Sequence, residues 1–298
     1  MKEKRKTIKC KQRMKGSSRV VMLILALAFV ITLIPAADIQ AAGNVTLENG
    51  YINSPAGAVK DGDKLYVYLG GKGVYEYDLT TGKKALLFKA KTSVARLFKH
   101  KEYIYLSATK RKGYRDYYSL VAYNLNTKKS KTLVKNANSA YVYNGSIYFS
   151  KGDGNKSKSY RMNYKGKKKK LYKGKLPYST DVIEMRPENG VTVKQQSGFQ
   201  VTAGGKKKTY TCSNNKGKAV ISVTSGKKTE KLGTFKYNSS DSMNSMQIVA
   251  VYKDYLLFSK SIHKKSKYNG TLYLMNLNDK SFVKLGTFTF DSPKEYAL

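Results

Sequence analysis

Residues 140–166 read AYVYNGSIYFSKGDGNKSKSYRMNYKG, and the pattern of this stretch decides the fold. Two tyrosine-rich, alternating runs flank Asn144-Gly145, and a third run follows a polar loop and ends at Gly166. Asn-Gly readily adopts the positive φ angles of a two-residue hairpin turn, while aromatic and β-branched residues favour strands. The stretch therefore predicts three antiparallel strands, which is most of a small four-stranded sheet.

The inner hairpin of this stretch recurs along the chain, which indicates a repeat architecture. Its copies, of which the fourth is the weakest, are 59–67, 98–106, 142–149, 186–193 and 251–258. An outer hairpin, with Asp or Asn before the turn and Gly or Lys within it, occurs at 75–84, 121–129, 160–167 and 273–280. Tyr66, Tyr105 and Tyr148 are 39 and 43 residues apart, a spacing that fits four short strands per repeat.

Small sheets of this kind cannot bury their apolar faces alone, and closure into a ring protects their edges. Inner runs such as 147–149 are apolar on both faces, as expected for sheets sandwiched between neighbours. The sequence predicts an all-β β-propeller of about five to six four-stranded blades, with an open meander or solenoid as the alternative. Two Lys-tipped hairpins, around 204–206 and 225–227, predict either a sixth blade or an insertion.

The first 42 residues have the composition of an export signal. A basic leader, 1–19, precedes an apolar run, 20–37, and Ile39 and Ala41 suit the −3 and −1 positions of a signal peptidase site. We expect cleavage after residue 41 or 42, which leaves a mature propeller domain, 43–298, without a transmembrane segment. An uncleaved signal anchor is the alternative. The protein is expected to be secreted, with retention at the cell wall by charge as a further option.

Charge is the most unusual feature of the composition. Lys and Arg total 57 against 19 Asp and Glu, a net charge of +38, and without residues 1–42 the balance is 48 against 17, or +31. Such a field attracts an anionic cell-wall polymer, an acidic glycan, extracellular nucleic acid or an acidic membrane surface. Lysine also keeps exposed sheets soluble and protects strand edges. A protein-interaction scaffold whose lysines serve solubility is therefore the alternative.

The repeat resembles secreted bacterial propellers of the TolB-like and YWTD-like kinds, which include domain-of-unknown-function relatives of the lipoprotein-receptor propeller. The matching residues are the Leu-Tyr pair at 65–66 and the Ile-Tyr pairs at 104–105 and 147–148. The Trp and Asp of the family motif are replaced at 106–107 by Leu-Ser and at 149–150 by Phe-Ser. The resemblance, over about 47–290, implies a propeller fold. It does not extend to the family's Asp network or its partners.

The order of strands in a blade sorts the basic residues between two faces. First–second and third–fourth turns share one face, and the third–fourth turns make a basic rim of Lys83-Lys84, Lys128-Lys129, Lys167–Lys170, Lys206–Lys208 and Lys227-Lys228. Second–third loops emerge on the other face, where Tyr beside Arg or Lys can stack on a ring and pair with an anion. The predicted ligand-binding residues in these loops are Lys110, Arg111, Lys112, Tyr114, Arg115, Lys264, Lys265, Lys267 and Tyr268. Arg111, Tyr114 and Arg115 are favoured, because Arg is rare here and its planar fork differs from the Lys background.

The sequence does not predict an enzyme. Glycan hydrolysis needs two facing carboxylates, and several acidic residues lie where local turn bonding explains them. Two His and, after signal removal, the single Cys212 predict no metal site, disulfide or cofactor. The predicted function is a monomeric, non-enzymatic binding module for an anionic polymer, with the scaffold, and less favoured a carbohydrate-active propeller enzyme, as alternatives.

Overall fold

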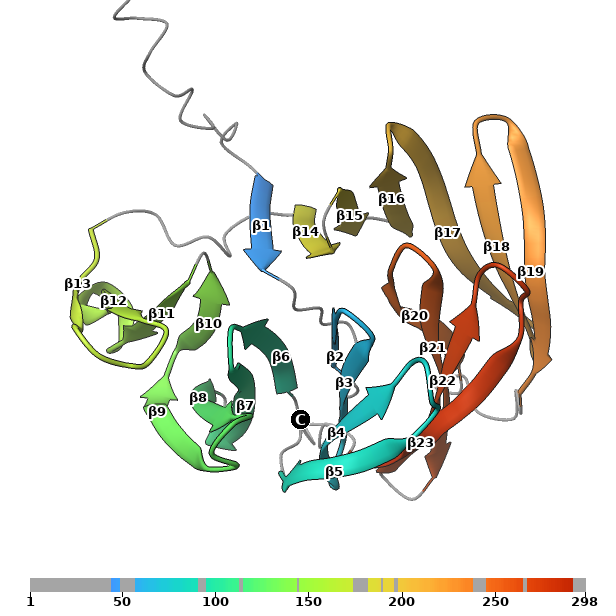
Figure 1. Cartoon of the computed structure of the whole chain (residues 1–298). Helices are drawn as coiled ribbons and strands as arrows, with labels where there is room; N and C mark the ends of the chain where they lie inside the picture. The colour runs from blue at the N-terminus through green and yellow to red at the C-terminus, as the bar shows by residue number, and fades with distance from the viewer. Residues whose placement is uncertain are drawn as a thin grey trace, which may run out of the picture. The chain divides into compact units, whose positions relative to one another are not determined.

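β-Strands make up almost all of the regular structure in the computed structural model (Figure 1). The structure describes residues 44–48, 57–90, 95–112, 115–143, 145–173, 182–188, 190–195, 198–237, 245–264 and 267–291, all within the unit Gly43–Leu298. The predicted export signal, 1–42, lies outside them. Among the described residues, no helix has the length and apolar character needed to cross a membrane.

Four sheets contain four antiparallel strands each, in the order of the chain. Sheet I comprises β2 (Ala58–Asp61), β3 (Lys64–Leu69), β4 (Gly73–Asp78) and β5 (Lys84–Lys89). Sheet II comprises β6 (Ala95–His100), β7 (Tyr103–Lys112), β8 (Arg115–Asn124) and β9 (Ser130–Ala137). Sheet III comprises β10 (Ser139–Tyr143), β11 (Ser146–Lys151), β12 (Lys158–Asn163) and β13 (Lys170–Leu171), with the 3₁₀ turn η1 (Gly154–Lys156) before β12. Sheet V comprises β20 (Ser245–Val251), β21 (Tyr255–Lys264), β22 (Lys267–Asn276) and β23 (Phe282–Asp291).

Sheet IV has seven strands and departs from this pattern. Its antiparallel strands are β14 (Val182–Glu188), β15 (Val191–Gln195), β16 (Phe199–Ala203), β17 (Lys206–Asn215), β18 (Lys218–Ser225) and β19 (Lys228–Lys236). The seventh strand, β1 (Asn44–Glu48), pairs with β14 in parallel. The two Lys-tipped hairpins are the β16–β17 and β18–β19 connections, so they extend sheet IV instead of forming a separate sixth sheet.

The outer turns are built from local hydrogen bonds that the Asp or Asn before each turn supplies. Asp78 Oδ1 accepts from the amides of Thr80 and Thr81 at 3.0 and 2.9 Å, and Asn124 and Asn276 accept from turn amides in the same way. The next residue ties each outer turn to the inner turn of its sheet. These links run from Leu79 N to Asp63 O (2.8 Å), Leu125 N to Glu102 O (2.8 Å) and Leu277 N to Asp254 O (2.9 Å). Inner and outer turns therefore meet at one end of each of these sheets.

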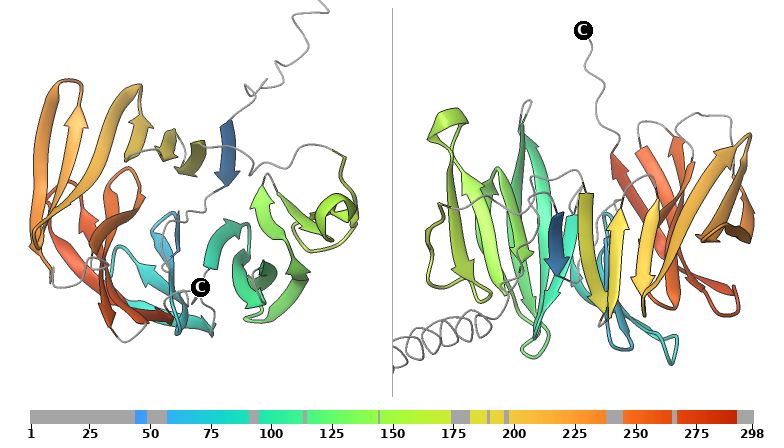
Figure 2. Two further views of the ribbon diagram at one scale, coloured as in Figure 1. Left: turned by 180° about the vertical axis from the view of Figure 1, so that it is seen from behind. Right: turned by 90° about the horizontal axis from the view of Figure 1, so that it is seen from above.

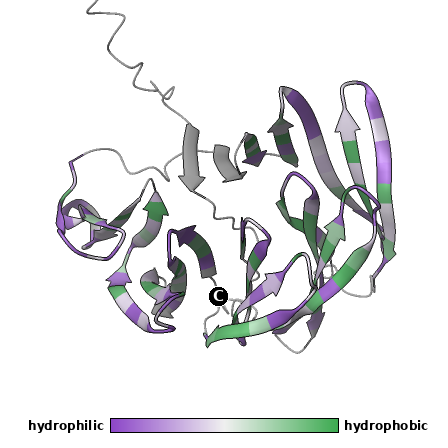
Figure 3. Cartoon of the chain, viewed as in Figure 1, coloured by the Kyte–Doolittle hydropathy of each residue, from purple (hydrophilic) through white to green (hydrophobic). Residues whose placement is uncertain are grey.

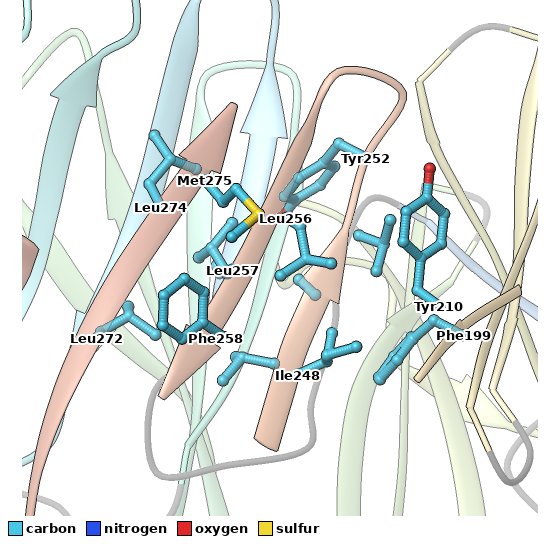
Figure 4. Packing of buried hydrophobic residues seen from close by; sticks show 14 of the residues in the cluster. Phe199, Tyr210, Ile248, Tyr252, Leu256, Leu257, Phe258, Leu272, Leu274 and Met275 are labelled. Carbon is cyan, nitrogen blue, oxygen red and sulfur yellow. The ribbon is translucent and has the colours of Figure 1, made fainter. Parts of the chain in front are cut away.

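Alternate residues of the inner strands pack against the sheets on either side. In β3, Leu65 and Val67 belong to a buried cluster shared with sheets IV and V, whereas Tyr66 and Tyr68 belong to one shared with sheet II. A further cluster joins sheets II and III. Hydrophobic and hydrophilic bands alternate along the strands in Figure 3, and Figure 4 shows the core between sheets IV and V. The prediction of strands buried on both faces is confirmed.

The last sheet returns to the first. Thr289 N donates to Gly70 O at 3.2 Å, and Lys84 Nζ donates to Leu285 O at 2.7 Å, so β23 lies against sheet I. Sheets I, II and III follow in order, and β1 lies between β10 of sheet III and β14 of sheet IV. Figures 1 and 2 show the five sheets arranged around a common centre. The chain is a β-propeller.

Candidate functional site

The hairpin turns divide the propeller surface into two faces. We name the end that carries the β2–β3 and β4–β5 turns, and their counterparts in the other sheets, the turn face. Contacts between neighbouring sheets join these ends: Lys99 Nζ lies 2.6 Å from Asp61 Oδ2, and Tyr105 Oη donates to Tyr164 O at 2.7 Å. The opposite end, which carries the β3–β4 and β7–β8 turns and their counterparts, is the ribbon face.

Every sheet contributes exposed lysines to the turn face. They are Lys83 and Lys84 from sheet I, Lys101, Lys128 and Lys129 from sheet II, Lys165 and Lys167–Lys170 from sheet III, Lys206–Lys208, Lys227 and Lys228 from sheet IV, and Lys253 and Lys280 from sheet V. The order of strands in the sequence therefore predicted correctly that the lysines of the third–fourth turns lie on one face, which is the turn face. The set includes inner-turn lysines as well, so the basic surface extends inward from the outer turns.

Tyrosine rings support several of these lysines. Lys101 Nζ and Lys165 Nζ lie 5.0 and 5.4 Å from the centroid of Tyr164, and Lys169 Nζ lies 5.0 Å from that of Tyr160. A cation over an aromatic face is attracted by the ring quadrupole. These contacts restrict the ammonium groups while leaving the lysines exposed, so the tyrosine-rich composition contributes to the basic surface.

Several carboxylates on the turn face form ion pairs or hydrogen bonds with residues of their own sheet or turn. Lys64 Nζ lies 2.6 Å from Asp78 Oδ2 and 3.2 Å from Glu76 Oε1. The hydrogen bond from Lys64, with those from the following turn, holds the pKa of Asp78 well below its usual range. Asp279 likewise accepts from Ser281 at 2.9 Å within its own turn. Turn chemistry thus accounts for Asp78 and Asp279, as their sequence positions indicated.

A cleft of about 270 Å³ opens on the turn face between sheets IV and V. Sheet IV supplies one wall, because Lys206, Lys208 and Tyr210 are alternate residues of β17 and share one side of the sheet. Their cross-strand partners Ala203 and Val201 lie on the same side of β16. The inner and outer turns of sheet V supply the other wall. The full lining is Val201, Ala203, Lys206, Lys208, Tyr210, Val223, Glu230, Leu232, Lys253, Asp254, Leu277, Asn278 and Lys280.

Two carboxylates and four ammonium groups line this cleft. Lys280 Nζ lies 2.5 Å from Glu230 Oε1, which joins sheet V to β19, and the hydrogen bond from Lys280 lowers the pKa of Glu230. Tyr210 is 3% exposed, and burial, followed by the charge of Asp254, raises the pKa of its hydroxyl. That hydroxyl points away from Phe199 in Figure 4. The cleft thus combines a positive rim, hydrogen-bond acceptors and an apolar floor.

The residues predicted for ligand binding lie on the ribbon face, in hairpins that are more regular than the expected loops. Strand β7 continues to Lys112 and β8 begins at Arg115, with Arg111 paired to Asp116. In sheet V, Lys264 pairs with Lys267 and His263 with Tyr268. Tyr and Thr within these segments favour strands, which is why the ladders extend so far. Lys110 and Lys267 are exposed. Tyr114 and Lys265 lie outside the described residues.

Sheet I separates the two predicted hairpins, because one belongs to sheet II and the other to sheet V. The described parts of the two hairpins therefore belong to sheets that are not neighbours in the ring. Each remains a prediction by itself. Among the described residues, no group of three or more His, Cys, Asp or Glu side chains is arranged to hold a metal ion.

Sequence reasoning did not single out most of the cleft. It placed Lys206–Lys208 in the basic rim, but Tyr210, Glu230, Asp254 and Lys280 were not grouped with them. One signal was available: the alternation of β17 puts Lys206 and Lys208 on the side of the buried Tyr210, where a regular strand would carry apolar residues. Lysines at such positions indicate that this end of the strand extends past the hydrophobic core, where its side chains reach solvent.

No protein-family model and no curated protein match the chain. Among solved structures, it is similar to an oligogalacturonate lyase in complex with manganese (11% identity, TM-score 0.28), over 75% of this chain and 62% of that one. It is also similar to TolB from Acinetobacter baumannii (11%, 0.28), over 83% of this chain and 55% of that one. A putative TolB from Agrobacterium tumefaciens is 11% identical with a TM-score of 0.30, and the match covers 84% of this chain and 82% of that one. Such distant likenesses transfer no function.

Proposed function

We propose that the protein is a secreted, non-enzymatic binding module whose turn face engages an anionic polymer of the cell surface or matrix. The observation that carries this proposal is that exposed lysines from all five sheets gather on one face. Single surface charges contribute little in water. A polymer that contacts many of them releases many counterions, and this supplies affinity without a deep pocket.

The scaffold alternative rests on lysines away from the turn face. Outer strands of several sheets carry exposed lysines, including Lys89 in β5, Lys135 in β9, Lys236 in β19 and Lys284 in β23. Charged side chains on edge strands prevent edge-to-edge association. Part of the net charge therefore serves solubility under either function. The two functions differ in whether turn-face lysines matter more for binding than an equal number of other lysines.

Two quadruple variants of equal charge separate these functions. The first, K83Q/K129Q/K167Q/K227Q, removes turn-face lysines outside the cleft from sheets I to IV. The matched control, K89Q/K135Q/K156Q/K236Q, removes exposed lysines at the opposite ends of the same four sheets. Binding of double-stranded DNA, polyglucuronic acid and polyphosphate would be measured over a range of salt concentrations by fluorescence anisotropy.

The turn-face variant is expected to bind at least about tenfold more weakly than the control and to show the smaller salt dependence. For DNA, each lost phosphate contact reduces the slope of log K against log salt by about 0.9. Equal losses in the two variants would mean that charge acts as a diffuse coat, which contradicts the proposed face. Absence of polyanion binding by the unmodified protein at low salt would also overturn the proposal.

A further inference from the structure

We propose that the cleft between β16–β19 and the turns of sheet V binds one acidic sugar unit, a hydroxylated ring that carries a carboxylate. This inference rests on the proposed function and narrows the polymer to an acidic polysaccharide.

The positive wall follows from strand geometry. Because side chains alternate along β17, Lys206 and Lys208 face the cleft above Tyr210, and Lys253 approaches from the inner turn of sheet V. A carboxylate between these ammonium groups would accept charge-assisted hydrogen bonds, which are the stronger kind. Lys280 is already paired with Glu230 at 2.5 Å, so Lys206 and Lys208 are the lysines assigned to the anion.

The acceptors distinguish this cleft from a simple anion site. Asp254 and Glu230 line it together with Asn278. Carboxylates repel an anion, so a site built only for phosphate or sulfate would gain from their absence. They suit a ligand that also presents hydroxyl donors, because an ionised carboxylate is acceptor-only and a hydroxyl can donate to it. A sugar with one carboxylate and several hydroxyls satisfies both parts of the lining.

The floor and the size fit a single sugar ring better than a nucleotide. Val201, Val223, Leu232 and Leu277 are aliphatic, and the one aromatic residue in the lining, Tyr210, is 3% exposed. Single-stranded nucleic acids bind largely by stacking bases on exposed aromatic rings, which this cleft does not offer. Its volume of about 270 Å³ lies just below the roughly 300–1,000 Å³ of drug-sized ligand sites. One unit of a polymer is the matching size.

Both walls are held in place from beneath. Leu277 N donates to Asp254 O at 2.9 Å, which fixes the two turns of sheet V relative to each other. Below the cleft, the Asn214 side chain forms two hydrogen bonds with the backbone of Met246, at 2.8 and 3.0 Å, between sheets IV and V. The buried cluster in Figure 4 continues this contact. Binding would therefore require little ordering of the site, which preserves affinity.

The test uses two variants of the cleft and one control. K206Q/K208Q removes two ammonium groups from the cleft, and K83Q/K129Q removes two from the turn face outside it. D254N removes a negative charge and a strong acceptor while leaving the backbone bond to Leu277 available. The probes are polyglucuronic acid, polyphosphate and the neutral glucan obtained by reducing the uronic acid. Thermal unfolding checks that each variant folds.

K206Q/K208Q is expected to weaken polyglucuronic acid binding about tenfold more than K83Q/K129Q does, and to weaken polyphosphate binding no more than that control. D254N is expected to weaken the binding of polyglucuronic acid, which has hydroxyl groups that need an acceptor. It is expected to strengthen the binding of polyphosphate, which has no such need. If D254N strengthens the binding of both probes, or if K206Q/K208Q and K83Q/K129Q weaken polyglucuronic acid binding equally, the cleft is not a sugar site. The proposed function then still holds when polyanions bind. If the unmodified protein binds no polyanion, both proposals fail.

Discussion

Replacing Asn214 by Ala should loosen the contact between sheets IV and V that lies under the cleft. The Asn214 amide nitrogen donates to Met246 O at 2.8 Å, and Met246 N donates to Asn214 Oδ1 at 3.0 Å. Met246 is 2% exposed, so water does not readily replace the lost partner of its backbone. Each hydrogen bond contributes about 0.5–1.5 kcal/mol net, so the two together account for about 1–3 kcal/mol of unfolding free energy. The Cys212 thiol still approaches Met246 O at 3.5 Å and keeps the loss near the middle of that range.

Urea denaturation followed by tyrosine fluorescence would measure this loss. For a domain of this size, a loss of about 2 kcal/mol corresponds to a fall in Tm of about 4–8 °C. Asn215→Ala is the matched control, because Asn215 is the exposed next residue of β17 and a surface substitution there should change stability by less than about 0.5 kcal/mol. If N214A and N215A unfold at the same urea concentration, Asn214 does not join the two sheets, and the rigid floor inferred for the cleft is wrong.

Two further predictions concern single positions, Lys128 in an outer turn of sheet II and the partly buried Cys212. Lys128 adopts φ 57° at the turn position that Gly82 occupies in sheet I with φ 68°. Lys128→Gly should raise the unfolding free energy by about 0.5–1 kcal/mol, because relief of left-handed strain exceeds the added freedom of the unfolded chain; a lower urea midpoint would contradict this. Burial raises the pKa of the Cys212 thiol to about 11. Its reaction with dithionitrobenzoate at pH 8 should be about 100-fold slower in the folded than in the urea-unfolded protein, and the stability gained from the neutral thiol should disappear as pH rises from about 9 to about 11. Equal rates in the two states would refute that shift.

The local parts of the fold could be predicted because adjacent residues determine them. Every inner hairpin read from the sequence is present, and Asp78, Asn124 and Asn276 build the outer turns through side-chain bonds to amides two or three residues ahead. The inner run 147–149, which is apolar on both faces, predicted neighbouring sheets on both sides. Each of these features depends on a few consecutive positions, so single-sequence patterns contain the required information.

Pairings between distant segments could not be predicted in this way. Strand β1 pairs with β14, more than a hundred residues later in the chain, and the sequence of Asn44–Glu48 contains no pattern that identifies β14 as its partner. The cleft depends in the same way on the approach of β17 and β19 to turns of sheet V. Strand preference also depends strongly on context, and this explains why Lys110–Tyr118 was interpreted as a loop although most of it continues the ladder between β7 and β8.

The irregular sheet is where the propeller acquires a feature that its repeats lack. Regular blades place lysines on the turn face through the same Asx turns, so their basic surface is similar from sheet to sheet. In sheet IV the added strands β18 and β19 widen the wall, and a bulge between Ile221 and Ser222 shifts the register of β19. Glu230 and Leu232, which are alternate residues of β19, both line the cleft, and Glu230 pairs with Lys280 of the neighbouring sheet. Because this junction adds acceptors and an apolar floor to the lysines, the proposed selectivity among anionic ligands should depend on sheet IV, while the proposed overall affinity should depend on the whole face.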